Sequence, residues 1–512
     1  MKNKLISYPK TVAFLCGWLA VAALPPFFVW PVLLICVSVL LWLINKSNSA
    51  KKSFGLGYSF GFAFFAFGLS WINNALLIEA TTFGWLIPIT FVASGAFFGL
   101  FAAIPAWLCW YVRKPILQYL LFTSLFVLCE WVRSFFLTGF PWNLLGTTLA
   151  FSDTMIQLAS IGGTYLLSLM VLLVAGIPFV FLNIKGLKNR VMLLSFVGIF
   201  IGGIYGFGWW RLNKHPYEKS DVVVRLVQPA IPQSMKWNPA QLDMNLQKHI
   251  KMSQYPSDEK INFIVWGETA FPYSLEFDDY QRSLLQYAIP EKTWLLTGGL
   301  RYKLLNDREY EVYNSLFVVD DKTNIVDSYD KSHLVPFGEY VPLREYLPKW
   351  ARPIASAIGN FRKGNGPKVM QVEKLPKFGG LVCYEVIFPH EILNQNNRPD
   401  WLVNITNDGW YGKSAGPYQH LVATKMRAVE EGVTIVRVAG SGISALVDPV
   451  GRIIAQIGLH QEGIADVNLP KISQFTTLYS CYGNLLIVGL CLLLVVLSGC
   501  SYNMLYKKQL TK

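Results

Sequence analysis

The chain has 512 residues, of which 53% are hydrophobic and 15% are aromatic, and its mean hydropathy is +0.36. This is more apolar than a soluble enzyme of such length, so the composition excludes an ordinary cytosolic protein and indicates a membrane protein. The net charge of +13 would suit a nucleic-acid partner. We expect none, because the basic residues crowd short loops between apolar runs and no nucleic-acid-binding motif accompanies them.

Seven apolar runs fill the first 212 residues, and each is predicted to cross a hydrocarbon layer about 30 Å thick. They cover residues 11–28, 29–44, 54–71, 85–112, 116–137, 155–182 and 191–210. A cleaved signal peptide is the alternative for the first run, but a second apolar run follows it in place of a small-residue cleavage site. An eighth run, residues 485–497, lies near the C-terminus.

Basic residues predict the orientation of these spans. The clusters of Lys and Arg lie at residues 46–52, 113–114, 185–190 and 507–512. With the N-terminus in the cytoplasm, all of them fall on the cytoplasmic side, as the positive-inside rule requires. We therefore predict a membrane domain of seven transmembrane helices at residues 1–212, an outer domain at 213–480, and an eighth helix with a cytoplasmic tail at 481–512.

Two features of the predicted membrane domain are unusual. Glu130 and Arg133 lie one helical turn apart inside the fifth span. Charged residues in a membrane usually pair, so we expect an ion pair that holds helices together, with a direct functional role as the alternative. The outer loops at residues 71–84 and 138–143 combine aromatic residues with Gly and Pro. They fit either an aromatic belt at the membrane surface or a lipid-facing vestibule beneath the outer domain.

Strand-like and helix-like segments alternate within the predicted outer domain. Short runs rich in β-branched and aromatic residues predict strands, and apolar residues at helical spacing predict helices at residues 239–253 and 417–431. The predicted strands are residues 222–227, 263–266, 294–297, 315–319, 381–384, 401–406, 434–438 and 444–447. This alternation indicates a layered α/β domain.

Three segments of this domain carry side chains suited to covalent catalysis. Cys383 ends the predicted strand that follows Gly379 and Gly380, Glu268 follows another apolar strand, and Lys331 comes just before a turn. Together they supply a nucleophile, a base and a cation. The alternative for Cys383 alone is a buried cysteine that packs as a small hydrophobic residue.

The chain order Glu268, Lys331, Cys383 resembles the Glu-Lys-Cys triad of the nitrilase superfamily. The longer strings at residues 331–339 (KSHLVPFGE) and 383–385 (CYE) resemble the apolipoprotein N-acyltransferase family, and the flanking hydrophobic segments extend this resemblance over almost the whole chain. The resemblance implies a four-layer α-β-β-α sandwich. The expected fold is therefore a multi-span α-helical membrane domain plus a nitrilase-like α/β domain.

The resemblance also implies the roles of the triad. Glu268 is expected to accept the proton of the Cys383 thiol as general base. Lys331 supplies a fixed positive charge that stabilises the thiolate and the tetrahedral oxyanion, helped by the backbone N–H of Tyr384.

Several further residues are expected to support the triad. Glu339 resembles the family's second carboxylate, which positions the lysine and the substrate; the alternative is a surface loop acid. Glu385 either orients the site or is structural. Trp237, Trp410 and Tyr411 lie in strings that resemble the family's, and they either line an acyl-chain groove or pack as ordinary aromatic core residues.

Two positions depart from the family's pattern. Gly267 precedes the base where many members carry proline, and Gly440-Ser441-Gly442 replaces a more Asn-rich turn. Neither change removes a triad group. His420 begins a predicted helix and is expected to be structural.

The cysteines do not predict a disulfide framework. Of the eight, all but Cys383 lie within or at the start of apolar runs, and no CxxC or His-rich spacing indicates a metal site. We expect neither a metal nor a cofactor.

The resemblance implies a ping-pong acyltransferase of the bacterial inner membrane, with its outer domain in the periplasm. Cys383 would take an acyl chain from a phospholipid, in particular phosphatidylethanolamine, to form a thioester. The α-amine of a diacylglyceryl-cysteine on an apolipoprotein would then attack and give a triacylated lipoprotein.

Two other functions stay open. One is a membrane-tethered amidase or nitrilase that hydrolyses a small C–N substrate, which would use water as acceptor. The other is a catalytically inactive scaffold or transporter. The intact triad argues against this last reading, as does the lack of paired broken spans of the kind that transporters use.

Overall fold

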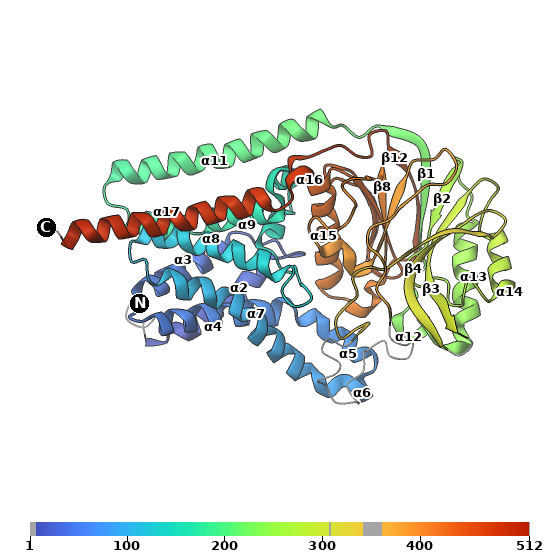
Figure 1. The fold of residues 1–512 in the computed structure, drawn as a ribbon, viewed down its shortest axis with the longest axis horizontal. Helices are drawn as coiled ribbons and strands as arrows, with labels where there is room; N and C mark the ends of the chain where they lie inside the picture. The colour runs from blue at the N-terminus through green and yellow to red at the C-terminus, as the bar shows by residue number, and fades with distance from the viewer. Residues whose placement is uncertain (1–6, 307–308, 341–360, 511–512) are drawn as a thin grey trace. The chain divides into compact units, whose positions relative to one another are not determined.

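The computed structural model describes residues 7–306, 309–340 and 361–510. The chain divides into two compact units (Figure 1). The helical unit combines Met1–Asn73, Glu79–His215 and Thr477–Lys512. The α/β unit combines Asn74–Ile78 with Pro216–Thr476, so a short piece of the N-terminal half belongs to it.

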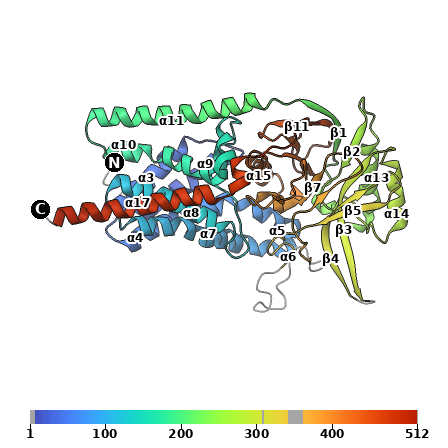
Figure 2. The same cartoon turned by 45° about the horizontal axis from the view of Figure 1, so that its top comes forward.

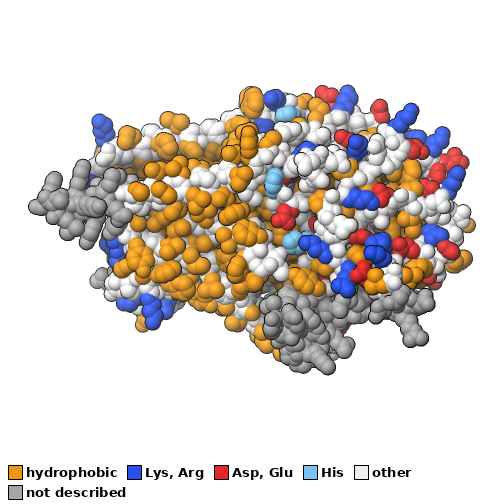
Figure 3. Space-filling view, viewed as in Figure 1, with side chains coloured by type: hydrophobic (Ala, Val, Ile, Leu, Met, Phe, Trp, Pro, Cys, Tyr) orange, Lys and Arg blue, Asp and Glu red, His pale blue; other side chains and the backbone are white. Residues whose placement is uncertain are grey.

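Apolar helices build most of the helical unit (Figure 2). They are α2 (Pro9–Ala20), α3 (Val32–Lys46), α4 (Ala50–Gly68), α6 (Ala80–Phe83), α7 (Ile87–Cys109), α8 (Pro115–Arg133), α9 (Ala159–Ala175), α10 (Ile177–Asn183), α11 (Leu187–Lys214), α16 (Leu478–Tyr482) and α17 (Leu485–Leu510). Figure 3 shows hydrophobic side chains gathered over the visible face of these helices. Such an outward apolar surface is what a lipid environment requires.

Several of these helices are long enough to cross a membrane. Within the described residues, four qualify by length and apolar composition: Ala80–Cys109, Pro115–Arg133, Met155–Asn183 and Leu187–Lys214. A fifth is formed if Ala50–Gly68 continues through a 45° bend into Ser70–Ile78. Three shorter apolar helices are Pro9–Ala23, Val32–Lys46 and Leu485–Cys500. Each predicted span thus contains a helix, while the count of eight spans stays a prediction.

Glu130 and Arg133 on α8 support the following loop in place of pairing with each other. The Glu130 Oε1 atom accepts a hydrogen bond from the N–H of Leu145 at 2.9 Å. The Arg133 guanidinium donates to the carbonyls of Phe140 and Trp142, each at 2.6 Å. No ion pair joins the two residues in the described part of the chain, contrary to the expectation. The physical reason is that an irregular loop among apolar helices must have its backbone groups satisfied by side chains.

The α/β unit contains two six-stranded sheets, in the orders β12-β1-β2-β3-β4-β5 and β11-β10-β9-β8-β7-β6. The strands of the first sheet are β1 (Lys219–Gln228), β2 (Ile261–Val265), β3 (Trp294–Asn306), β4 (Glu309–Val319), β5 (Ile325–Asp330) and β12 (Gly463–Pro470). Those of the second are β6 (Val369–Met370), β7 (Phe378–Val382), β8 (Trp401–Thr406), β9 (Thr434–Ala439), β10 (Ser444–Val447) and β11 (Ile453–Ile457).

The two sheets pack face to face. Phe263 from the first sheet and Trp401 and Val436 from the second belong to one buried apolar core. The helices of this unit are α5 (Asn74–Ile78), α12 (Gln233–Lys236), α13 (Leu242–Ser253), α14 (Asp279–Ser283) and α15 (Gly416–Glu431). Helix α13 packs on the outer face of the first sheet and α15 on that of the second. This α-β-β-α order confirms the predicted sandwich.

The strands differ from the prediction in two ways. Four were missed, namely β5, β6, β11 and β12. The strand that leads to the nucleophile also ends earlier than predicted, because β7 stops at Val382 and Cys383 opens the 3-10 turn η9 (Cys383–Ile387). Similarly, β2 ends at Val265, so Glu268 lies in the loop beyond it.

Candidate active site

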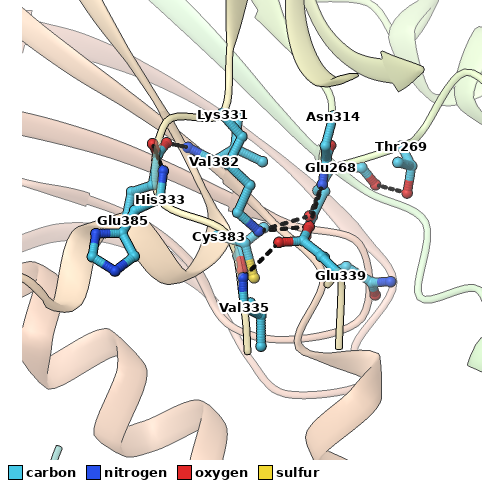
Figure 4. A network of polar contacts seen from close by, with 12 residues as sticks. Glu268, Thr269, Asn314, Lys331, His333, Val335, Glu339, Val382, Cys383 and Glu385 are labelled. Atoms are coloured by element: carbon cyan, nitrogen blue, oxygen red, sulfur yellow. Dashed lines mark hydrogen bonds and ion pairs between the residues drawn. The ribbon is translucent and has the colours of Figure 1, made fainter. Parts of the chain in front are cut away.

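Three strand ends bring the predicted triad together (Figure 4). Lys331 follows β5 directly, Cys383 follows β7, and Glu268 lies just beyond β2. All three side chains are buried. The sheets thus hold the predicted base, cation and nucleophile in one buried cluster at their edge.

Lys331 lies between two carboxylates. Its Nζ atom donates to Glu339 Oε1 at 2.8 Å and is 3.9 Å from Glu268 Oε1. Burial alone would lower the pKa of Lys331, but the charges of Glu339, Glu268 and Cys383 outweigh burial and raise that pKa. The lysine therefore remains a fixed positive charge at neutral pH.

Asn314 is a site residue that the sequence analysis missed. Its amide Nδ2 donates to Glu268 Oε1 at 2.7 Å and to Glu339 Oε1 at 3.1 Å. The second oxygen of Glu339 accepts the N–H of Val335 at 2.8 Å. These bonds hold two like charges near one lysine. The only sequence signal was a polar residue directly before the predicted strand at residues 315–319, a feature that many structural residues share.

Cys383 adopts a strained backbone conformation at the start of η9. Its φ is +53°, a left-handed value that a residue with a Cβ rarely adopts and that costs on the order of 1–3 kcal/mol. Burial and the charge of Glu268 raise the pKa of the thiol to about 12, although Lys331 and Thr406 oppose them. The Cys383 thiol is therefore neutral at neutral pH, and as a nucleophile it would need a base to accept its proton.

Glu385 ties the nucleophile's turn to the loop that carries Lys331. Its Oε2 atom accepts the N–H of Val382 at 2.7 Å. Its Oε1 atom accepts the N–H of Ser332 and the hydroxyl of Tyr329, each at 2.7 Å. This arrangement fits an orienting role. Tyr384 is buried beside it, and burial holds the pKa of its phenol well above the usual range.

A second lysine, Lys236, supports the loop of the base. It ends α12, and its Nζ atom donates to the carbonyl oxygen of Glu268 at 2.7 Å. Burial lowers the pKa of Lys236 to about 8, against the opposing charges of Glu268 and Cys383. The sequence analysis missed this role, for which the only signal was the position next to Trp237.

The three predicted aromatic residues lie at two different places. Trp237 lines a cavity of about 430 Å³ together with Phe271, Tyr273, Phe277, Leu300, Tyr302, Leu304 and Tyr310, among others. Trp410 and Tyr411 lie on the 3-10 turn η10 (Asp408–Tyr411) and do not line that cavity. The carbonyl of Tyr411 accepts a hydrogen bond from the amide of Asn74 on α5 at 2.7 Å. An acyl-chain groove shared by all three stays untested.

His420 lies in the first turns of α15 and contacts the nucleophile's backbone. Its Nδ1 atom is 2.9 Å from Asp408 Oδ1, and its Nε2 atom is 3.2 Å from the carbonyl oxygen of Cys383. The two departures from the family's pattern also meet nearby. A Cβ on Gly267 would lie 3.0 Å from the backbone nitrogen of Gly440, whereas a Cβ on Gly440 would meet nothing within 4 Å.

Comparisons with known proteins agree along the chain. Residues 16–177 match the apolipoprotein N-acyltransferase N-terminal domain, and residues 223–476 match the carbon-nitrogen hydrolase domain. The apolipoprotein N-acyltransferase of Rhodopseudomonas palustris is 36% identical over 510 residues, covering 95% of this chain and 94% of that protein. The protein of the same name from Rickettsia typhi is 34% identical over 475 residues, covering 93% of this chain and 95% of that protein. Among solved structures, an amidase of the nitrilase superfamily from Nesterenkonia covers 50% of this chain and 92% of its own, with 18% identity and a TM-score of 0.37.

Proposed function

The chain belongs to the apolipoprotein N-acyltransferase family, and on that premise we propose that Glu268, Lys331 and Cys383 carry out its acyl transfer in two steps. The enzyme is an acyltransferase that N-acylates lipoproteins. The observation that carries the proposed mechanism is the buried cluster in which a neutral thiol, a fixed ammonium and two carboxylates lie together.

In the first step, the Cys383 sulfur attacks the ester carbonyl of a phospholipid while Glu268 accepts the thiol proton. Lys331 and the backbone N–H of Tyr384 stabilise the oxyanion that forms. The ester C–O bond then breaks, and the leaving alkoxide of the lysophospholipid takes the proton from Glu268. The product is an acyl thioester on Cys383. The family resemblance favours phosphatidylethanolamine as the donor.

In the second step, the α-amine of a diacylglyceryl-cysteine attacks the thioester. Glu268 accepts a proton from the amine nitrogen, the C–S bond breaks, and the Cys383 thiolate recovers its proton. The product is an amide at the N-terminus of the lipoprotein. Water must be kept from the thioester between the two steps, and the burial of Cys383 supports this requirement.

The enzyme is a membrane protein, and we place it in the bacterial inner membrane with the α/β unit in the periplasm. The Lys and Arg clusters support this orientation, since all of them then lie in the cytoplasm. The domain boundaries at residues 1–212, 213–480 and 481–512 belong to the same proposal.

Mass spectrometry of the purified enzyme tests the proposed mechanism. Given phospholipid alone, the wild-type enzyme should become acylated on Cys383 and remain so for far longer than one catalytic cycle. A peptide with an N-terminal diacylglyceryl-cysteine should then discharge the thioester and carry an amide. Cys383→Ala should perform neither step. Rapid release of free fatty acid, at a rate that the peptide does not change, would instead identify a hydrolase.

A further inference from the structure

The backbone carbonyl of Cys383 is held by two buried side chains. The His420 Nε2 atom lies 3.2 Å from this oxygen, and the Asn404 Nδ2 atom lies 3.4 Å from it. The same peptide group carries the N–H of Tyr384. Because a peptide group is planar and trans, fixing the direction of the carbonyl also fixes the direction of the N–H, which points the opposite way.

We propose that His420 is a positioning residue that fixes the Cys383–Tyr384 peptide plane and thereby aims the Tyr384 N–H at the oxyanion. This inference rests on the proposed role of Cys383 as nucleophile. It concerns a residue that the sequence pattern marked as structural only.

The contacts around His420 form a closed ring. Asp408 Oδ1 lies 2.9 Å from His420 Nδ1, and Asp408 Oδ2 accepts from Arg437 Nη2 at 2.7 Å. Arg437 Nη1 donates to Asn404 Oδ1 at 2.7 Å. The Asn404 Nδ2 atom in turn lies 3.4 Å from the Cys383 carbonyl oxygen, which closes the ring. All four side chains are fully buried. Buried charged groups are costly, and apolar replacements are often neutral or stabilising, so stability alone does not explain the ring.

The surroundings of His420 keep a proton on its Nε2 atom. A carbonyl oxygen only accepts hydrogen bonds, so the contact with Cys383 is favourable only when Nε2 carries a proton. Burial and the charge of Arg437 lower the pKa of His420, against the opposing charge of Asp408, so the ring is neutral at neutral pH. In the neutral ring, Nδ1 can accept from Arg437 Nη2 at 3.1 Å, which leaves the proton on Nε2.

The backbone strain at Cys383 explains why side chains are needed to hold its carbonyl in place. With φ at +53°, this residue would relax toward a commoner conformation if its peptide were free to rotate. The rotation would move the Tyr384 N–H away from the reacting carbonyl. The ring of contacts opposes it from the side of the peptide that faces away from the substrate.

Two reactions of Cys383 in the full-length enzyme test the proposal. Acylation by phospholipid passes through an oxyanion, whereas alkylation by iodoacetamide displaces iodide and forms none. His420→Met removes the donor, and we expect its acylation rate at saturating phospholipid to fall about ten- to a hundred-fold, somewhat less than the loss of a whole oxyanion donor. The phospholipid concentration for half-maximal rate and the alkylation rate should stay within about two-fold of wild type, because neither depends on the oxyanion.

Conservative variants distinguish the loss of the hydrogen bond to the Cys383 carbonyl from a loss of folding. His420→Gln can still present an N–H to the carbonyl and should recover most of the acylation rate. Asn404→Asp keeps the contact with Arg437 but sets an acceptor against the Cys383 carbonyl, so it should slow acylation and spare alkylation even if His420→Met fails to fold. Glu431→Gln is the matched control, because this buried acid on the same helix contacts His390, Gln395 and Arg398, away from the site.

The proposal is overturned if His420→Met acylates at the wild-type rate, or if acylation and alkylation fall in parallel in both His420→Met and Asn404→Asp. Equal losses in His420→Gln and His420→Met would also overturn it. A wild-type enzyme that is never acylated would defeat the proposed function, which is a separate outcome.

Discussion

In the proposed mechanism Cys383 enters the reaction as a neutral thiol, since burial and the charge of Glu268 raise its pKa to about 12. At neutral pH such a group is almost never a thiolate, so attack depends on proton transfer during the reaction itself. Glu268 is the proposed base, and two contacts hold it: Asn314 donates to its side chain, and Lys236 donates to its backbone carbonyl.

Glu268→Gln should keep these contacts while removing the proton acceptor. We expect the rate of thioester formation on Cys383 to fall about a hundred- to ten-thousand-fold, the usual contribution of a general base. Mass spectrometry after timed exposure to phospholipid measures the rate. Glu462→Gln is a suitable control, because this acid is exposed and pairs with Lys248, which is not a triad residue. Normal accumulation of acyl-enzyme in Glu268→Gln would remove Glu268 from the role of base.

Lys236 should give the reaction a dependence on pH. Burial lowers its pKa to about 8, so the side chain is charged below that pH and becomes neutral above it. A charged Lys236 favours negative charge at Cys383, and we therefore expect the acylation rate to fall about tenfold as pH rises through 8. Lys236→Met should be slower at neutral pH and lack this fall, while Lys248→Met, at a half-buried lysine that pairs with Glu462, should match wild type. An unchanged pH profile in Lys236→Met would show that another group causes it.

At the scale of elements, the buried central strands could be predicted from the sequence, whereas the four edge strands of the two sheets could not. The strands that lead to Glu268 and Cys383 are apolar runs because both of their faces are covered. By contrast, β5 and β11 are half-exposed edge strands whose mixed composition resembles a loop. The triad could be proposed from the sequence because its motifs are local, and it stays a prediction. Asn314 and His420 were not recognised, because their partners are distant in sequence and only the folded sheets bring them together.

The close packing of the two sheets makes Gly380 on β7 a sensitive position. A Cβ there would lie 2.8 Å from a ring carbon of Tyr329 and 3.0 Å from a methyl of Leu316. Gly380→Ala should therefore destabilise the α/β unit by about 1–3 kcal/mol, as overpacked cores generally do. Gly440→Ala is the control, since its Cβ would meet nothing within 4 Å and should leave stability unchanged or slightly higher. Thermal denaturation of both variants in detergent measures the difference, and equal melting temperatures would contradict the predicted clash.

At the scale of the whole molecule, the helices can be assigned a side of the membrane only through charge. Lys185 lies between α10 and α11, Lys188 and Arg190 lie in the first turn of α11, and α11 leads to the α/β unit. Among the described residues, not every apolar helix is long enough to cross a membrane by itself. The orientation therefore needs a measurement independent of helix length.

Reporter fusions provide that measurement. A reporter fused at Lys185 should be active in the cytoplasm, and one fused at Asn306, within the β3–β4 hairpin, should be active in the periplasm, because the positive-inside rule places them on opposite sides. A fusion beyond the last helix serves as the cytoplasmic reference. If both reporters respond on the same side, the eight-span arrangement is wrong.

The chain passes between its two units four times. The crossings lie at Asn73–Asn74, Ile78–Glu79, His215–Pro216 and Thr476–Thr477. A gene fragment for residues 216–476 alone would omit Asn74, whose amide caps the carbonyl of Tyr411. Residues 216–476 alone therefore do not contain the whole α/β unit. Recombination that exchanged it between relatives would have to transfer residues 74–78 in the same event, so we expect the two parts of the gene to have been inherited together.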